Sequence, residues 1–547
     1  MKTGKVSEDK SMSEQSKKSL RSLPDKRIVQ ILILAVMGIL FYLVLGQEWI
    51  AIEDDTPFYL NPRREGVMPV YPLFLFGVKC IFGERLYLDA VVVIQSVLAI
   101  VCTMVFVLYL QKQFQLKFIE TVLLYVACML PFSIYLPEAG ITHQILTEGL
   151  SYAFFYLYFL LLLQYVFTQK IRWVAAATAM AGFMELIRSQ MLFLLGVTAA
   201  VFVCVEFVKG KKDKIGWRIV RTAADCVIGV VGILLVVSMV YKIYGWYYIH
   251  QLPVIENWEP KTVAGQTGIS EAAGEGNDES GGVQSIANGE LGANAGQQSA
   301  DTEQAQDTVQ QEENKITYAE NNSSFSQFTA LVITRGIYEI DADDIELFDS
   351  PEMKEIFQRV FDAVDAEQYR YVYARQDLYM WKDLVKDRIP LVVFGHVGAY
   401  LRDNPDVQMD NVKICQELAV KVLLHHFDRY LYHSFRMMIS GFISSVFFQI
   451  ERIYLLCHII TLLLYLAAAA GIIYCLRRGG NRKVAAFALT TLAYIFLMVT
   501  VTNLVFLGLQ RYMVYAMGIF YCSLYLLARE AVLITAEGSA WIKKLKR

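Results

Sequence analysis

The residues best suited to chemistry begin with three consecutive acids at 53–55. Asp54 and Asp55 stand directly after an apolar run, and Tyr59 follows them. Adjacent carboxylates could ligate a divalent cation, or one of them could act as a general base that takes a proton from a hydroxyl. Alternatively, these acids could lie in water just beyond the end of a membrane helix and have no chemical role. The cluster is therefore a candidate catalytic or cation-binding group.

Arginines stand near these acids and at the ends of other apolar runs. Arg63 and Arg64 follow the acids, Arg188 ends an apolar run, and Arg511 begins one. The planar guanidinium binds phosphate oxygens well, so these side chains could hold a phosphorylated lipid. Alternatively, these arginines could bind lipid headgroups, pair with nearby acids or anchor helix ends at the membrane interface. For Arg188 we expect a partner in Glu185, three residues earlier on one helix.

The segment 137–149 adds a carboxylate and an imidazole. Glu148 begins an apolar run, where the N-terminus of a helix favours a negative charge. Alternatively, Glu148 could cap the helix. His143 could likewise form only a structural hydrogen bond. Polar groups at the edge of hydrocarbon are costly, which makes both residues functional candidates.

The amino-acid composition indicates whether the chain that positions these residues lies in water or in a lipid bilayer. The 547-residue chain is 55% hydrophobic and 19% charged, with a net charge of −3, and its mean hydropathy is +0.39. A soluble domain averages about 45–50% apolar and about 25% charged residues. The apolar excess is concentrated in runs of about twenty residues, the length that crosses a bilayer. We therefore predict an all-α polytopic membrane protein in a lipid bilayer, and we expect no nucleic-acid partner.

About ten apolar runs are candidate membrane spans. They start near residues 28, 86, 118, 145, 173, 190, 217, 453, 484 and 511. The runs between 173 and 208 could instead form one long helix, or a re-entrant piece and one span. The stretch 67–82 is too short to cross and is expected in the interface.

Short basic loops predict the orientation of these spans, because Lys and Arg of such loops stay in the cytoplasm. With ten spans, all basic stretches fall on one side: 2–27, 112–117, 170–172, 209–221, 477–483 and 543–547. This predicts a multi-pass protein of the cytoplasmic membrane with both termini in the cytoplasm. The loops 47–85, 137–144 and 508–510 then face outward.

The chain divides into five parts on this basis. They are a basic tail (1–27), a membrane module with the first outer loop 47–85 (28–245), an extracytoplasmic region (246–452), C-terminal spans (453–530) and a second basic tail (531–547). Within the outer region, 262–314 has few large apolar residues and is predicted to be disordered. Helical spacing of apolar residues at 348–364, with Ser350 before Pro351, predicts a mostly helical folded part. An amphipathic helix or two at 414–448 is expected to lead back to the bilayer.

Cysteines give no sign of a disulfide framework or a zinc site. The nine cysteines lie mostly in apolar runs, without a CxxC spacing or a cluster with histidine.

An ordered set of motifs resembles bacterial GT-C glycosyltransferases, which include protein mannosyltransferase-like enzymes and the aminoarabinose transferase that modifies lipid A. The similar motifs are DTPFY at 55–59, REGVMPVYP at 64–72, LTE at 146–148, LIR at 186–188, LHHFDRYL at 424–431 and QRY at 510–512. Together they cover nearly the whole chain in the family's order. Thr56 and Asp428 depart from the family pattern, which usually has Glu and Pro there.

The resemblance implies transfer of a sugar from a polyprenyl-phosphate donor to an acceptor outside the membrane, which could be a protein, a polymer or a glycolipid. Asp55 would be the general base, with Asp54 as second choice, and Glu148 would orient the acceptor or share a divalent cation. The remaining roles are donor-phosphate binding by Arg63, Arg64, Arg188 and Arg511, and substrate contacts by Tyr59, Tyr71, His143 and Tyr512.

Two other functions are compatible with the residues. A transporter or flippase of polyprenyl lipid or polysaccharide would have broken helices and internal repeats, and no repeat is visible by eye. A non-catalytic envelope assembly protein would not bring the acids and arginines together. Convergence of these side chains therefore discriminates between an enzyme and an assembly protein.

Overall fold

The computed structural model describes most of the apolar part of the chain and part of the polar region 246–452. The described residues are 27–41, 49–52, 56–60, 68–134, 140–209, a few positions between 229 and 243, 339–366, 388–405, 407, 411–447, 453–505 and 513–545. These residues are overwhelmingly helical and form no strand; one isolated bridge joins Ala51 and Gln144. The prediction of an all-α fold is confirmed for this part of the chain.

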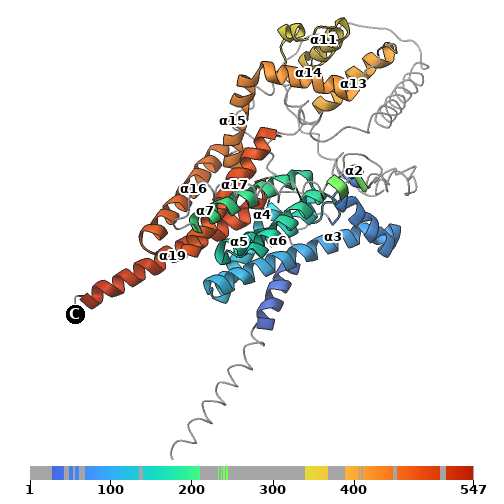
Figure 1. Ribbon diagram of the computed structural model, residues 1–547. Coiled ribbons are helices and arrows are strands. Elements are labelled where there is room, and N and C mark those ends of the chain that lie inside the picture. The colour runs from blue at the N-terminus through green and yellow to red at the C-terminus, as the bar shows by residue number, and fades with distance from the viewer. Residues whose placement is uncertain are drawn as a thin grey trace, which may run out of the picture.

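A bundle of long apolar helices makes up the body of the molecule (Figure 1). It contains α3 (Val70–Phe114), α4 (Phe118–Ile134), α5 (Thr147–Thr168), α6 (Ile171–Ile187), α7 (Phe193–Lys209), α16 (Tyr454–Arg477), α17 (Arg482–Val505) and α19 (Tyr515–Leu545). Six helical segments are long and apolar enough to cross a membrane: Val70–Phe114, Thr147–Thr168, Ser189–Phe207, Leu455–Arg477, Arg482–Leu504 and Tyr515–Ala536. The chain is therefore a membrane protein with a helical bundle.

Four of the predicted spans do not reach this length in the described residues. Arg27–Phe41 and Phe118–Met129 are shorter apolar helices, and α6 has 17 residues. The predicted span that starts near 217 lies largely outside the described residues. A perpendicular crossing needs about 20 residues, so the described helices include six candidate spans.

Two breaks in the helices decide questions that the apolar pattern left open. Gly83 has φ 72° and ψ 172°, a conformation that favours glycine, and it separates 70–82 from the longer part of α3. The candidate span Val70–Phe114 therefore consists of two helices, 70–82 and the longer part after Gly83. Arg188 and the 3₁₀ turn η1 (Ser189–Leu192) separate α6 from α7, so the runs between 173 and 208 form two helices.

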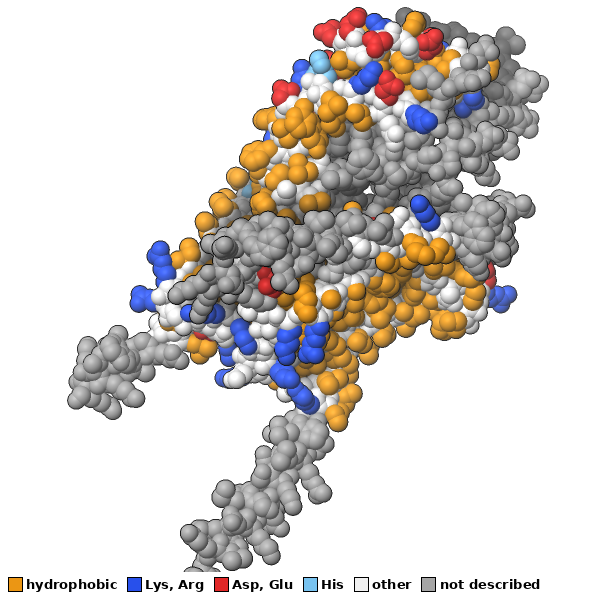
Figure 2. Space-filling model, in the orientation of Figure 1, with side chains coloured by type: hydrophobic (Ala, Val, Ile, Leu, Met, Phe, Trp, Pro, Cys, Tyr) orange, Lys and Arg blue, Asp and Glu red, His pale blue; other side chains and the backbone are white. Residues whose placement is uncertain are grey.

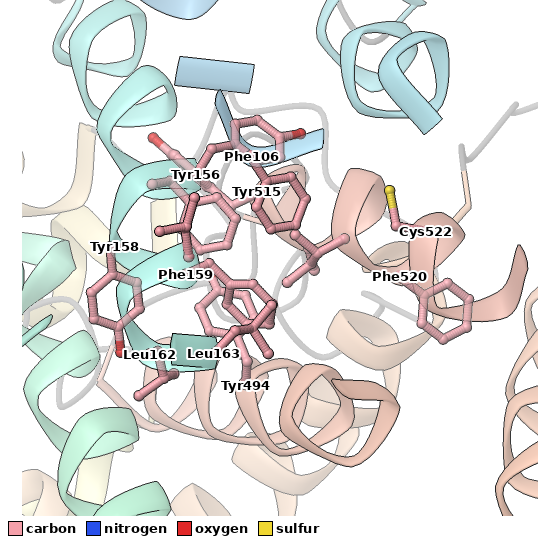
Figure 3. Packing of buried hydrophobic residues seen from close by; sticks show 14 of the residues in the cluster. Phe106, Tyr156, Tyr158, Phe159, Leu162, Leu163, Tyr494, Tyr515, Phe520 and Cys522 are labelled. Atoms are coloured by element: carbon pink, nitrogen blue, oxygen red, sulfur yellow. The ribbon is translucent and has the colours of Figure 1, made fainter. Parts of the chain in front are cut away.

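Aromatic side chains fill the core where α3, α5, α17 and α19 meet (Figure 3). Phe155 of α5 packs on Tyr494 of α17 and on Tyr515 of α19, with ring centroids 5.0 and 5.7 Å apart. Tyrosine hydroxyls in this apolar surrounding find acceptors: Tyr152 and Tyr156 donate to the carbonyl of Cys128 at 2.8 and 3.0 Å. Such bonds matter because hydrocarbon offers no water to replace them.

Gly518 lets α19 approach α4 and α5 closely. A Cβ at this position would overlap the Tyr156 hydroxyl and lie 3.0 Å from the Cα of Cys128. We expect Gly518→Ala to destabilise the protein by about 1–3 kcal/mol, because the backbone of α4 must move. The thermal midpoint of purified protein measures this loss. Gly196→Ala in α7 is the control, since no atom lies within 4 Å of its Cβ; an equal loss in both variants would contradict the packing argument.

A smaller helical unit with its own core stands beyond one end of the bundle (Figure 1). It contains η2 (Ala342–Leu347), α11 (Pro351–Ala366), α13 (Arg388–Asp403) and α14 (Asn411–His425). The predicted helix start is confirmed, because Ser350 Oγ accepts the backbone N–H of Met353 at 3.1 Å. Its buried residues include Ile356, Phe357 and Val360. The predicted disordered stretch 262–314 lies outside the described residues.

Helix α15 (Phe427–Ser444) links this unit to the bundle. The Tyr430 hydroxyl donates to the carbonyl of Leu504 near the end of α17, at 2.6 Å. Further along α15, Gly441 packs closely against the side chains of Val499 and Asn503. The unit therefore stands over the end of the bundle at which α17 ends.

The two ends of the bundle differ in their content of basic side chains. Lys and Arg side chains gather at the end away from the helical unit (Figure 2). They belong to the helix ends at that side and include Lys112, Lys170, Arg477 and Arg482. The last helix, α19, continues to Leu545 and so extends into the predicted C-terminal tail.

Candidate functional site

A buried ion pair joins α5 to the end of α6. Arg188 Nη1 contacts Glu148 Oε1, and the two side chains are 11% and 3% exposed. The same Nη1 donates to Thr147 Oγ1 at 3.3 Å, and Arg188 Nε donates to Gln190 Oε1 at 3.0 Å. Two of the sequence-predicted site residues, a carboxylate and a guanidinium, thus meet at one end of the bundle.

Local backbone geometry explains why these two residues meet. A tight turn through Gln169, at φ 55°, reverses the chain between α5 and α6. The first turn of α5 and the last turn of α6 therefore lie at the same end. Arg188 itself is extended, with φ −151° and ψ 117°, which directs its side chain away from the path of the α6 helix.

The expected pair between Glu185 and Arg188 is wrong. Arg188 has left the helix, so the spacing of three residues no longer places its side chain beside Glu185. Glu185 is 8% exposed, and its Oε2 has no hydrogen-bond partner in the part of the chain that the structure describes. A buried carboxylate oxygen without a partner is unusual, and it lies one turn before the buried ion pair.

Gln95 of α3 connects the other polar groups at this end. Its Oε1 accepts the hydroxyl of Tyr71 at 3.0 Å. Its Nε2 donates to the carbonyls of Thr142 and Gln144 at 3.0 and 3.2 Å. Gly149 leaves room for this amide, because a Cβ there would lie 2.6 Å from it. The glutamine thereby holds the loop that leads into Glu148.

The loop predicted to be the first outer one, 47–85, contacts the same segment. The backbone N–H of Ala51 donates to His143 O at 3.0 Å, and Ile145 N donates back to Ala51 O at 3.1 Å. Thr56 Oγ1 donates to the carbonyl of Ile145 at 3.3 Å. The ring of Trp49 meets that of His143 edge to face, with centroids 5.4 Å apart. The described residues 49–52 and 56–60 of this loop therefore contact the site.

The start of α19 also reaches this place. The hydroxyls of Tyr515 and Ser151 lie 2.8 Å apart, and Ser151 is one turn after Glu148 on α5. Tyr59 stands edge to face with Tyr71, with centroids 5.3 Å apart. Five elements thus border one buried polar region: α2 (Thr56–Leu60), α3, α5, the end of α6 and the start of α19.

Loss of the Gln95 amide should loosen this region. We expect Gln95→Leu to destabilise the protein by about 1–3 kcal/mol, because the Tyr71 hydroxyl and two carbonyls lose a buried partner. Tyr71→Phe removes a single hydrogen bond and should have a smaller effect. Thermal midpoints of the two purified variants test this order, and the reverse order would show that Gln95 does not connect the region.

The structure brings five of the sequence-predicted site residues to this region. They are Glu148, Arg188, Tyr59, Tyr71 and His143. The other six lie outside the described residues: Asp54, Asp55, Arg63, Arg64, Arg511 and Tyr512. Sequence reasoning missed Gln95, Gln190 and Ser151. A polar amide inside the apolar run of α3 was the available signal for Gln95, since such groups are costly in a membrane.

The arrangement can hold a guanidinium in a fixed orientation, because a carboxylate and two neutral oxygens contact it. Glu148 balances the charge of Arg188, so an anion bound there would share the guanidinium with this carboxylate. Comparisons with protein-family models, with curated proteins and with solved structures found no match. The chemistry of these side chains is thus the basis for inferring a function.

Proposed function

We propose that this protein is an inverting glycosyltransferase of the GT-C type. It moves a sugar from a polyprenyl-phosphate donor to an acceptor outside the cytoplasmic membrane. About ten spans, a cytoplasmic location of the basic helix ends and an extracytoplasmic helical unit belong to the same proposal. The concentration of Lys and Arg at the end away from that unit supports this orientation (Figure 2).

One observation carries the proposal: separate chain segments next to the proposed site residues all contact the residues 145–151, which lead into α5 and form its first turn. Thr56 follows Asp55 in the chain and bonds to Ile145. Tyr515 follows the QRY motif at 510–512 and bonds to Ser151. Arg188 pairs with Glu148 itself. An assembly protein has no need to gather these segments around a buried carboxylate.

The proposed reaction uses these residues as follows. Asp55 takes the proton of the acceptor hydroxyl while that oxygen attacks the anomeric carbon of the donor sugar. The bond from the anomeric carbon to the phosphate oxygen breaks, and the configuration inverts. Arg188, Arg511 and one of Arg63 or Arg64 stabilise the negative charge of the leaving polyprenyl phosphate. Glu148 holds Arg188 in position, and a divalent cation shared by these acids is a further option.

Mass spectrometry of envelope glycans and glycoproteins, from cells with and without this protein, tests the proposal. We expect one class of envelope molecule to lose the mass of one sugar when the protein is absent. Restoring the wild-type chain should restore that mass. Unchanged glycans, together with movement of a labelled polyprenyl phosphate across vesicles that contain the purified protein, would replace the proposal with a flippase.

A further inference from the structure

A second polar cluster lies where the helical unit meets α15, apart from the site at the start of α5. Asp344 of η2, His425 at the end of α14 and His426 each offer one ligand atom, and these atoms lie within 4.8 Å of one another. His426 Nε2 is 2.8 and 3.0 Å from the two carboxylate oxygens of Asp344. His425 Nε2 is 4.0 Å from the nearer of these oxygens, Oδ1.

A break between two helices directs both imidazoles to one carboxylate. Helix α14 ends at His425, and α15 begins at Phe427. His426 between them has φ −102° and ψ 36°, which is not helical. In an unbroken α-helix, successive side chains point about 100° apart. Here the two rings meet edge to face instead, with centroids 4.7 Å apart.

Asp344 is held in place by its own turn. It is 1% exposed, and its Oδ2 accepts the backbone N–H of Asp341 at 2.7 Å. Asp341 in turn accepts the backbone N–H of Asp344, so the two form a capping box. The neighbouring cation, Arg429, is 3.1 Å from Asp341 and so is balanced by it. The carboxylate of Asp344 therefore keeps its orientation toward the two histidines.

The donor set fits a zinc-class ion. Two imidazole nitrogens with one carboxylate oxygen are ligands that Zn²⁺ takes in open sites, whereas Mg²⁺ and Ca²⁺ prefer oxygen alone. Tetrahedral coordination with bonds of about 2.0–2.1 Å places ligand atoms about 3.3 Å apart. His426 Nε2 lies 2.8 and 3.0 Å from the two Asp344 oxygens and His425 Nε2 lies 4.0 Å from one of them, which brackets this value, and all three ligand atoms lie within 4.8 Å of one another. His425 is 54% exposed, so it can shift slightly and admit the ion from solvent.

We propose that Asp344, His425 and His426 bind one Zn²⁺ ion, with water at the fourth position. The ion joins η2 to the junction of α14 and α15 and so stiffens the connection between the helical unit and the bundle. Binding of this ion is independent of the proposed sugar transfer, and either can fail without the other.

Metal titration of the full-length protein in detergent tests this proposal. Protein stripped with a chelator is titrated with Zn²⁺ against a chromophoric competitor, and its thermal midpoint is recorded. We expect about one Zn²⁺ per chain and a higher midpoint. His425→Ala should weaken binding by at least about 10–100-fold and remove the rise in midpoint. Because His425 is exposed, this variant is expected to fold.

His433→Gln provides a matched control. His433 Nδ1 lies 2.6 Å from Glu339 Oε1, in a neighbouring pair of one imidazole and one carboxylate. This variant should bind Zn²⁺ as the wild type does, and Ca²⁺ should not compete. The proposal is overturned if the wild type binds no Zn²⁺, if His425→Ala binds it equally well, or if His433→Gln weakens binding as much. In each of these cases the contact between Asp344 and His426 is a structural hydrogen bond only.

Discussion

Asp55→Asn is expected to lower the rate of sugar transfer by about 10²–10⁴-fold, the usual contribution of a general base. The amide of Asn has nearly the shape of the carboxylate but cannot take the acceptor proton. Membrane insertion and folding should therefore stay as in the wild type. The amount of sugar-bearing product in cells, relative to the amount of monodisperse protein purified from them, measures the effect.

Asp54→Asn is the matched control for this prediction. It removes an equal charge one residue away, and we expect transfer close to that of the wild type. If Asp54→Asn is the inactive variant and Asp55→Asn is active, the base is Asp54. Near-normal transfer by both variants would remove this acidic cluster from the reaction, and the transferase mechanism would have lost its proton acceptor.

Glu148→Ala should destabilise the protein by about 3–5 kcal/mol, because it removes the carboxylate that contacts the buried guanidinium of Arg188. Both side chains are nearly inaccessible, at 3% and 11% exposure. The thermal midpoint in detergent should fall accordingly. Glu355→Gln is the control, since Glu355 pairs with Arg359 at the surface of the helical unit, where such pairs contribute little. A similar midpoint for both variants would show that the buried pair is well solvated.

A double variant separates the structural role of this pair from its role in the reaction. Glu148→Gln with Arg188→Met removes both charges, so no unpaired charge stays buried, and we expect the midpoint to recover in large part. Transfer should stay about 10²–10³-fold lower, since the leaving phosphate has lost a positive partner. Recovery of transfer along with stability would make Arg188 a structural residue only.

The sequence by itself determined that the chain lies in a lipid bilayer, and it determined the local structure. Runs of apolar residues predicted a membrane protein, and six of the expected spans correspond to candidate membrane helices. Helical spacing at 348–364 and Ser350 before Pro351 predicted α11, which begins at Pro351. These features depend on residues within one or two turns of each other, so the pattern of side chains contains enough information to predict them.

Contacts between distant segments were decided only by the tertiary structure. Arg188 pairs with Glu148 and not with Glu185, because the backbone leaves the helix at Arg188 and the packing of α5 on α6 supplies the nearer carboxylate. Likewise, Asp344 and His426 are 82 positions apart and meet where η2 packs against the break before α15. Residue types and spacing indicate which groups can react. Which of them share a site depends on helix ends and packing, which no local pattern specifies.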